Sequence, residues 1–192
     1  SRAFFEFTSS IVILFSNFDI NRIFPSIFVT YVGIVTASVT APVFKMQEAG
    51  RYIFYFGFIV YLLLIIPVFM RMIKGDKIPE AAFPICTIFA APASLCLAGY
   101  LSSFSDKNDI MLYILVGLSL FMTFAVLIFL YKFHTKKFYP SFSALTFPFV
   151  ISALALKSYI KYLNTNPDNM FLSKNLLVNI YYFELLVSVF II

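Results

Sequence analysis

The sequence predicts an all-α integral membrane protein built from repeated helical hairpins, and three observations support this class. Hydrophobic residues make up 61% of the 192 residues and charged residues only 12%, whereas soluble domains carry about 25% charged residues. Apolar runs long enough to cross a hydrocarbon core of about 30 Å alternate with short polar linkers. Three alternate apolar runs also begin with the same pattern. Together these observations place the chain in a lipid bilayer.

The apolar runs set the expected order of elements. A run at 3–16 is too short to cross and is expected to be the remainder of another span. Six longer runs are expected to be transmembrane helices, at roughly 25–44, 52–72, 83–101, 110–131, 140–162 and 175–192. Short links between long helices favour antiparallel hairpins, so we expect a single transmembrane domain over 1–192. Because the chain lacks an initial Met and stops inside an apolar run, we expect it to be part of a longer protein.

Three alternate runs form an internal repeat. Each begins with an aromatic residue followed by a proline, at Pro25, Pro84 and Pro140. Proline is tolerated in the first helical turn, because its missing N–H would have no helical partner there. Eight residues later, each copy carries a residue that weakens or breaks a helix: Gly33, Pro92 and Pro148. The repeat therefore predicts three helices that are interrupted at a similar depth.

Small side chains surround these interruptions, whereas the intervening runs at 52–72 and 110–131 are bulkier. The contrast predicts bulky helices that face lipid and interrupted helices that gather inside. Carbonyl groups freed at a break must be satisfied by protein or water, so breaks at one depth indicate a shared axis. Close helix packing through small residues is the alternative. The candidate pore-lining and break residues are Gly33, Thr36, Ala91, Pro92, Ser94, Thr146, Pro148 and Ser152.

The residue directly before each break differs among the three copies. It is Val32 in the first, Ala91 in the second and Phe147 in the third. If this position faces a common axis, the only bulky copy, Phe147, would plug a channel that its counterparts leave open. The alternative is a core aromatic residue, in a chain that has 26 Phe.

Three stretches resemble one transporter family: "PSIFVTYVGIVTASVTAP", "APASLCLAGYLS" and "FSALTFPFVISALAL". They are similar to the fifth, seventh and ninth helices of the tellurite-resistance/dicarboxylate transporter (TDT) family, which includes the plant guard-cell slow anion channels and bacterial TehA. The resemblance covers essentially the whole chain. It implies the last six to seven helices of a ten-helix family pattern, with the first and third pore helices missing from this chain.

The resemblance carries further expectations about fold and function. It implies five hairpins in a quasi-fivefold barrel, odd helices around the pore, and a homotrimer in which each protomer has its own pore. A family Phe that occludes the pore matches Phe147. The implied substrates are small anions such as malate and other C4-dicarboxylates, tellurite, sulfite, nitrate and chloride, with no cofactor. The alternative is a non-conducting membrane interaction subunit or fragment.

Basic residues indicate an orientation in the membrane. The densest clusters, at 71–77 and 132–137, fall on one side, and the positive-inside rule predicts that loops 71–83 and 132–139 are cytoplasmic in an inner or plasma membrane. We interpret the basic run "KFHTKK" as an anchor of this kind and expect no nucleic acid partner. On the other side, Lys157 and Lys161 are expected to attract anions into a vestibule.

The sequence gives little support for catalysis or for a metal site. The single histidine, His134, and scattered acids do not form the clusters that an enzyme or a metal site needs, so we expect neither. Cys86 and Cys96 are predicted to be buried thiols, because ten helical residues separate them by about 15 Å. Glu184 lies inside the last apolar run, and its role stays open between a protonated acid and a paired group at a helix or subunit contact.

Overall fold

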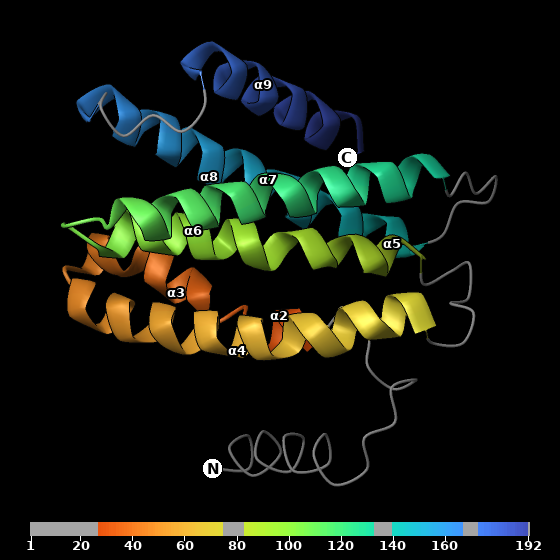
Figure 1. Ribbon diagram of the computed structural model, residues 1–192, viewed down its shortest axis with the longest axis horizontal. Helices are drawn as coiled ribbons and strands as arrows, with labels where there is room; N and C mark the ends of the chain where they lie inside the picture. The colour runs from red at the N-terminus through yellow and green to blue at the C-terminus, as the bar shows by residue number, and fades with distance from the viewer. Residues whose placement is uncertain (1–26, 75–82, 133–139, 167–172, 192) are drawn as a thin grey trace, which may run out of the picture.

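The computed structural model describes residues 27–74, 83–132, 140–166 and 173–191 (Figure 1). Within these ranges all regular elements are helices. The long helices run roughly side by side across the view of Figure 1, and α6 lies between α4 and α7. The short run predicted at 3–16 and the first proline of the repeat, Pro25, lie outside the described residues.

Each of the three repeated hairpins pairs an interrupted segment with a continuous helix. The first consists of α2 (Ile27–Tyr31), α3 (Val35–Thr40), the 3-10 turn η2 (Ala41–Phe44) and α4 (Gln47–Lys74). The second consists of α5 (Phe83–Cys86), η4 (Thr87–Ala90), α6 (Ala91–Ser103) and α7 (Asp109–Lys132). The third consists of η5 (Pro140–Leu145), α8 (Thr146–Thr165) and α9 (Lys174–Ile191).

The helices confirm an all-α membrane protein. Four of them are long and apolar enough to cross a membrane, over Gln47–Met70, Pro84–Ser103, Asp109–Tyr131 and Ser143–Thr165. The first and last predicted spans correspond to shorter apolar helices in the described chain, Val35–Phe44 and Asn175–Val189.

The interruptions coincide with the repeated helix-breaking positions. Around Gly33, the N–H of Val35 donates to the Val32 carbonyl at 2.9 Å and that of Thr36 to the Gly33 carbonyl at 3.0 Å. These are i→i+3 bonds, the pattern of a tight turn rather than an α-helix. The 3-10 segment η4 ends two residues before Pro92, and η5 ends three residues before Pro148, because a proline has no N–H to donate and its ring crowds the carbonyl four residues earlier.

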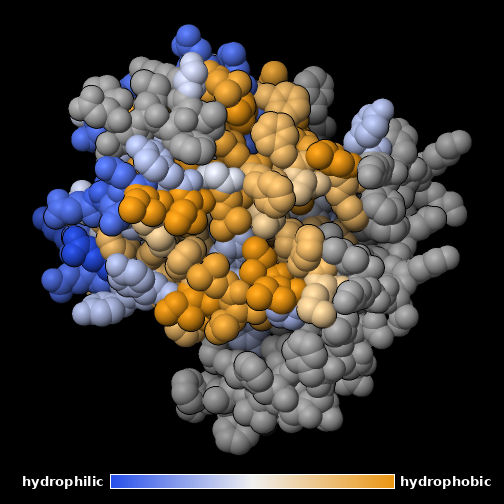
Figure 2. All heavy atoms as spheres, viewed as in Figure 1, coloured by the Kyte–Doolittle hydropathy of each residue, from blue (hydrophilic) through white to orange (hydrophobic). Residues whose placement is uncertain are grey.

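The central helix of the bundle is α6. Of the apolar stretch within the span Pro84–Ser103, 83% is buried, against 22% of that within the α4 span and 39% of that within the α7 span. It contacts α3, α4, α7 and α8. The bulky helices α4 and α7 keep exposed apolar faces, which contribute to the broad hydrophobic surface in Figure 2, so lipid is the expected neighbour of these faces.

Small residues let the helices approach closely at one end of the bundle. A Cβ added to Gly50 of α4 would lie 2.4 Å from the hydroxyl oxygen of Ser103 on α6. The Ser103 hydroxyl in turn donates to the Ser38 carbonyl of α3 at 2.6 Å, and the two serine hydroxyls are 2.9 Å apart. Close contact and interhelical hydrogen bonds are the usual means of helix association in a bilayer.

Candidate functional site

The three interrupted segments meet around a small cavity of about 30 Å³. Its lining includes Val32 and Gly33 from the first copy of the repeat, Ala91 and Pro92 from the second, and Phe147 from the third. The fold therefore brings the break of all three copies to one place, although the copies are far apart in the sequence. A cavity of this volume holds about one water molecule, which is too little space for a hydrated anion.

Phe147 lies at the margin of this cavity. It is the second residue of α8, and its side chain is 42% exposed, whereas the next two residues, Pro148 and Phe149, are buried. Pro148 is therefore packed between helices and is not among the residues that line the cavity. The ring of Phe147 is the largest side chain that the third copy contributes to the lining.

Threonine hydroxyls satisfy carbonyl groups within each interrupted segment. Thr36 donates to the Gly33 carbonyl, Thr87 to the Pro84 carbonyl at 2.6 Å, and Thr146 to the Ser143 carbonyl at 2.8 Å. All three bonds span three residues, so the same local device recurs in the three segments. Protein hydroxyls thus supply part of the hydrogen bonding that an interrupted membrane helix requires.

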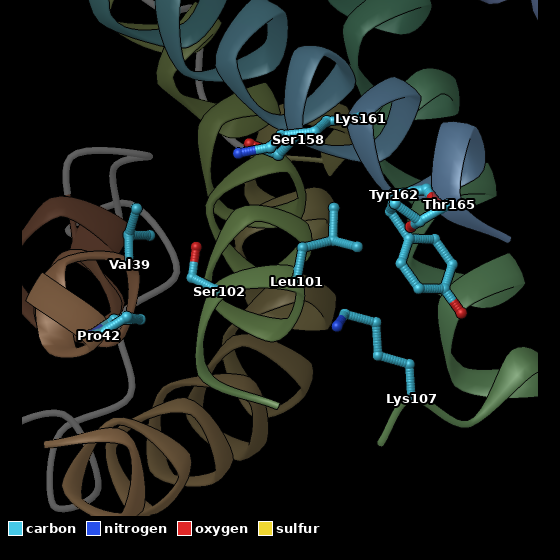
Figure 3. Close-up of a pocket in the computed structure, with 9 residues that line it drawn as sticks. All are labelled: Val39, Pro42, Leu101, Ser102, Lys107, Ser158, Lys161, Tyr162 and Thr165. Atoms are coloured by element: carbon cyan, nitrogen blue, oxygen red, sulfur yellow. Dashed lines mark hydrogen bonds between the residues drawn. The ribbon is translucent and has the colours of Figure 1, made fainter. Parts of the chain in front are cut away.

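A second, larger cavity of about 400 Å³ opens between the same segments, nearer the end where α6 leads into α7 (Figure 3). It is lined by Val39 of α3, Leu101 and Ser102 of α6, Lys161 of α8, and Lys107 of the loop that follows α6. Two lysine ammonium groups thus border one cavity.

Lys107 is held by its surroundings. Its ammonium donates to the Phe104 carbonyl at 2.8 Å and lies 5.0 Å from the centre of the Tyr162 ring, a cation–π contact. Burial lowers the pKa of Lys107, and the neighbouring Asp106 carboxylate opposes part of this shift. Of the two lysines predicted for a vestibule, Lys161 lines the cavity, whereas Lys157 is exposed and is not part of the lining.

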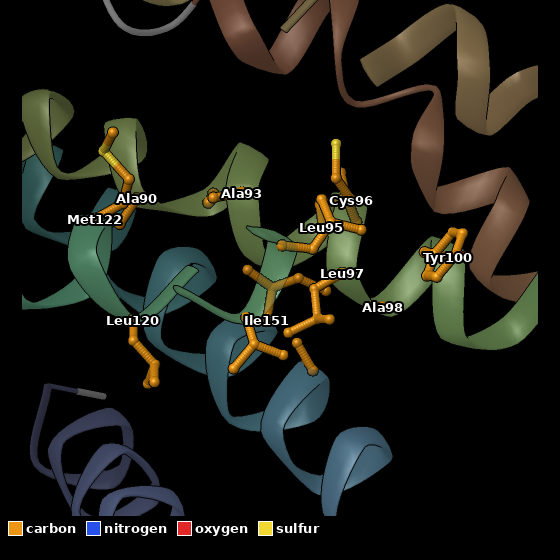
Figure 4. Packing of buried hydrophobic residues seen from close by; sticks show 14 of the residues in the cluster. Ala90, Ala93, Leu95, Cys96, Leu97, Ala98, Tyr100, Leu120, Met122 and Ile151 are labelled. Atoms are coloured by element: carbon orange, nitrogen blue, oxygen red, sulfur yellow. The ribbon is translucent and has the colours of Figure 1, made fainter. Parts of the chain in front are cut away.

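Two predicted pore residues have their hydroxyls directed toward other helices. Ser94 on α6 is fully buried and lies 2.8 Å from the Ser119 hydroxyl of α7. Ser152 on α8 is also fully buried and lies 3.0 Å from the Thr123 hydroxyl of α7. These polar contacts sit among apolar side chains that join α6, α7 and α8 (Figure 4).

The position of Ser94 in the helical period indicates that its side chain faces away from the small cavity. Successive residues of an α-helix turn by about 100°. Ser94 follows Pro92 by two positions and so lies about 200° around α6 from it. The cavity-lining Pro92 and the buried Ser94 therefore face opposite sides of one helix.

A family model described as voltage-dependent anion channel (SLAC1) matches residues 2–190. The chain belongs to the voltage-dependent anion channel family. No curated protein and no solved structure matches the chain. Family membership confirms the resemblance seen in the sequence, and it identifies a multi-pass membrane protein of an anion channel and transporter family rather than an enzyme family.

The two cavities differ in the chemistry of their linings. Lysine charge and hydroxyl groups border the larger cavity, and apolar side chains with backbone border the smaller one. In the same described ranges, no cluster of three or more His, Cys, Asp or Glu side chains could hold a metal ion. Cys86 and Cys96 are both buried and are not joined in a disulfide.

Proposed function

We propose that the chain forms part of the wall of a narrow anion conduit whose gate is Phe147. The observation that carries this proposal is the meeting of Phe147 with Gly33, Ala91 and Pro92 around one cavity of about 30 Å³. A ring at the margin of so small a space blocks an ion that keeps its hydration shell. Moving the ring aside would widen this space, and the larger cavity lies further along the same segments.

The lysines of the larger cavity support anions as the transported species. Lys107 and Lys161 raise the local anion concentration, because a cleft lined by one sign of charge focuses its field on counter-ions. Beyond them, the described lining of the small cavity carries no charged side chain. Weak binding in such a stretch favours fast transit, since a tight site would retain the ion. Small anions such as C4-dicarboxylates, tellurite or sulfite are the substrate class that we propose.

The assembly and orientation of the channel are part of the same proposal. We expect a homotrimer in an inner or plasma membrane, with loops 71–83 and 132–139 in the cytoplasm; most of both loops lies outside the described residues. Ser105, an exposed residue of the opposite loop, then lies outside the cell. In Ser105→Cys, a membrane-impermeant thiol reagent applied to intact cells should label the new thiol, and labelling only after lysis would reverse the orientation.

Flux through the full-length protein in liposomes tests the gate. We expect Phe147→Ala to increase the flux of malate, chloride, sulfite or tellurite at a set membrane potential, because the substitution removes the ring from the small cavity. A matched control is Phe121→Ala on α7, whose ring is 65% exposed and does not line either cavity.

Two results would contradict the proposal that Phe147 is the gate. One is unchanged flux in Phe147→Ala protein that elutes and unfolds like the wild type. The other is an equal increase in both alanine variants, which would reflect general loosening of the bundle. Absence of flux for every anion in both the wild type and Phe147→Ala would instead support a non-conducting subunit.

A further inference from the structure

Glu184 is a buried acid that neither cavity uses. It lies on α9, is 1% exposed, and has its carboxyl Oε1 3.0 Å from the Ser152 hydroxyl oxygen on α8. Its other oxygen, Oε2, is buried and has no hydrogen-bond partner among the residues that the structure describes. An acid inside a membrane segment is costly when ionised, so its surroundings should show how it is tolerated.

A chain of oxygen atoms continues from Glu184 across two more helices. The Ser152 hydroxyl lies 3.0 Å from the Thr123 hydroxyl of α7, and Thr123 donates to the Ser119 carbonyl at 3.0 Å. The direction of this last bond is fixed, because a carbonyl only accepts. The path from carboxyl to carbonyl therefore contains three contacts and joins α9, α8 and α7.

A count of protons shows in which state of the acid every contact can be a hydrogen bond. Each of the three contacts needs one proton between its two oxygens, and the two hydroxyls supply one each. The Thr123 proton goes to the Ser119 carbonyl. If Glu184 were a carboxylate, the Ser152 proton would go to the carboxylate, and the Ser152 and Thr123 oxygens would face each other at 3.0 Å with no proton between them.

A carboxylic acid supplies the missing proton. Glu184 then donates to Ser152, Ser152 donates to Thr123, and Thr123 donates to the Ser119 carbonyl, so every contact becomes a hydrogen bond. The orphan Oε2 becomes the carbonyl oxygen of a neutral acid, which is far less costly to bury than half of a carboxylate.

We propose that Glu184 is a neutral carboxylic acid and the first donor of a one-way hydrogen-bond chain that positions the gate-bearing helix α8. Ser152 follows Pro148 by four residues, one helical turn beyond the break. The chain therefore ties the first regular turns of α8 to α7 and α9. It also leaves no negative charge behind the helix that carries the proposed gate, and this second part rests on the proposed function.

The surroundings of the acid agree with a neutral state. A cavity of about 280 Å³ between α7 and α9 is lined by Thr123, Asn179, Glu184 and four apolar side chains, with no other charged side chain in this lining. Ser152, from α8, is the remaining polar contact. None of these neighbours titrates near neutral pH, so no described partner compensates an ionised Glu184.

Infrared difference spectra of the reconstituted full-length protein test the acid directly. A protonated carboxyl has a carbonyl stretch that is resolved from the bands of a carboxylate. We expect this band at neutral pH, its loss in Glu184→Gln, and its persistence in the control Glu48→Gln, because Glu48 is an exposed acid at the start of α4. Absence of the band in the wild type at neutral pH would overturn the proposal.

Two serine substitutions test the direction of the chain. Ser152→Ala should shift the Glu184 band to higher frequency, because the acid loses the acceptor that the described residues provide. Ser158→Ala, on the same helix, should leave the band in place, because the Ser158 hydroxyl donates to the Leu154 carbonyl at 2.9 Å and does not contact the acid. An unmoved band in folded Ser152→Ala protein would mean that Glu184 does not donate to Ser152.

Flux measurements separate a positioning role from a proton-carrying one. Glu184→Gln keeps a donor toward Ser152, so we expect flux within about twofold of the wild type and no pH dependence across the neutral range. Loss of flux in Glu184→Gln, together with pH-dependent flux in the wild type, would make Glu184 a proton carrier and overturn the proposal. The infrared bands do not depend on transport, so a failure of the Phe147 gate would leave them interpretable.

Discussion

Gly33→Ala tests the close backbone approach at the first break. A Cβ at position 33 would lie 2.2 Å from the Val29 carbonyl oxygen, whereas Cβ contacts under 3.0 Å are essentially never observed. The atom in the way belongs to the backbone, so no side-chain rotation relieves the contact. The turn between α2 and α3 must open by most of an ångström, and this movement disturbs the packing of Val32 and Val35, which are both buried.

The expected cost follows from overpacking. Forcing extra atoms into a well-packed interior costs about 1–3 kcal/mol. A loss of about 2 kcal/mol lowers the ratio of folded to unfolded protein about 30-fold. We therefore expect the midpoint temperature of unfolding in detergent to fall clearly in Gly33→Ala.

The same glycine-to-alanine substitution at Gly117 is a control for which we expect the opposite result. A Cβ added to Gly117 of α7 meets nothing within 4 Å beyond the local backbone of its own helix, and alanine is favoured over glycine in a helix interior by about 1 kcal/mol. Gly117→Ala should therefore match or exceed the wild-type midpoint. If Gly33→Ala were as stable as Gly117→Ala in the same detergent, the first break would not need glycine, and the account of its geometry would be refuted.

Three further predictions concern the end of the bundle where the larger cavity opens. Because burial lowers the pKa of Lys107, its ammonium should lose its proton at a lower pH than an ordinary lysine, and anion flux should fall as the pH rises toward 10.5. Lys107→Arg should remove this fall, because arginine stays charged. Persistence of the fall in Lys107→Arg would exclude Lys107 as its cause. Asn108 accepts hydrogen bonds from the N–H groups of Ile110 at 3.0 Å and Met111 at 3.3 Å. Thermal unfolding should therefore show that Asn108→Ala is less stable than the wild type by about 1 kcal/mol, the typical value of a helix N-cap. Asn108→Asp should change the stability little. Ser103→Ala removes two hydrogen bonds between α6 and α3, leaves the one from Ser38 to the Gly99 carbonyl, and should cost about 0.6–1.7 kcal/mol. Chemical unfolding measures this, and an unchanged stability would show that the Ser103 hydroxyl contributes only packing.

Several features of the site were predictable because they depend on local chemistry. A proline removes a backbone donor wherever it lies in a helix, so the interruptions near Pro92 and Pro148 follow from their positions in the repeat. The contrast in side-chain bulk likewise indicated which helices expose apolar faces. The role of Phe147 stays a proposal, although the fold places it with the other breaks.

Other features depended on contacts between segments that are distant in the sequence. Lys157 and Lys161 were both predicted for the vestibule, yet Lys157 does not line the larger cavity. Lys107, which the sequence did not single out, does line it, because the conformation of its loop is set by the helices on which the loop packs. Thr87 satisfies the Pro84 carbonyl at the start of the second interrupted segment, and its residue type alone does not distinguish it from other small polar residues of the chain.

The sequence by itself determined the environment, the helical class, the family and the places where the helices break. These follow from hydropathy and from backbone chemistry, which act over a few residues. Only the tertiary structure decided which way each polar side chain turns. Ser94 and Ser152 face neighbouring helices, and Glu184 meets Ser152 across a helix interface, because the partner of a buried polar group is supplied by whichever helix packs against it.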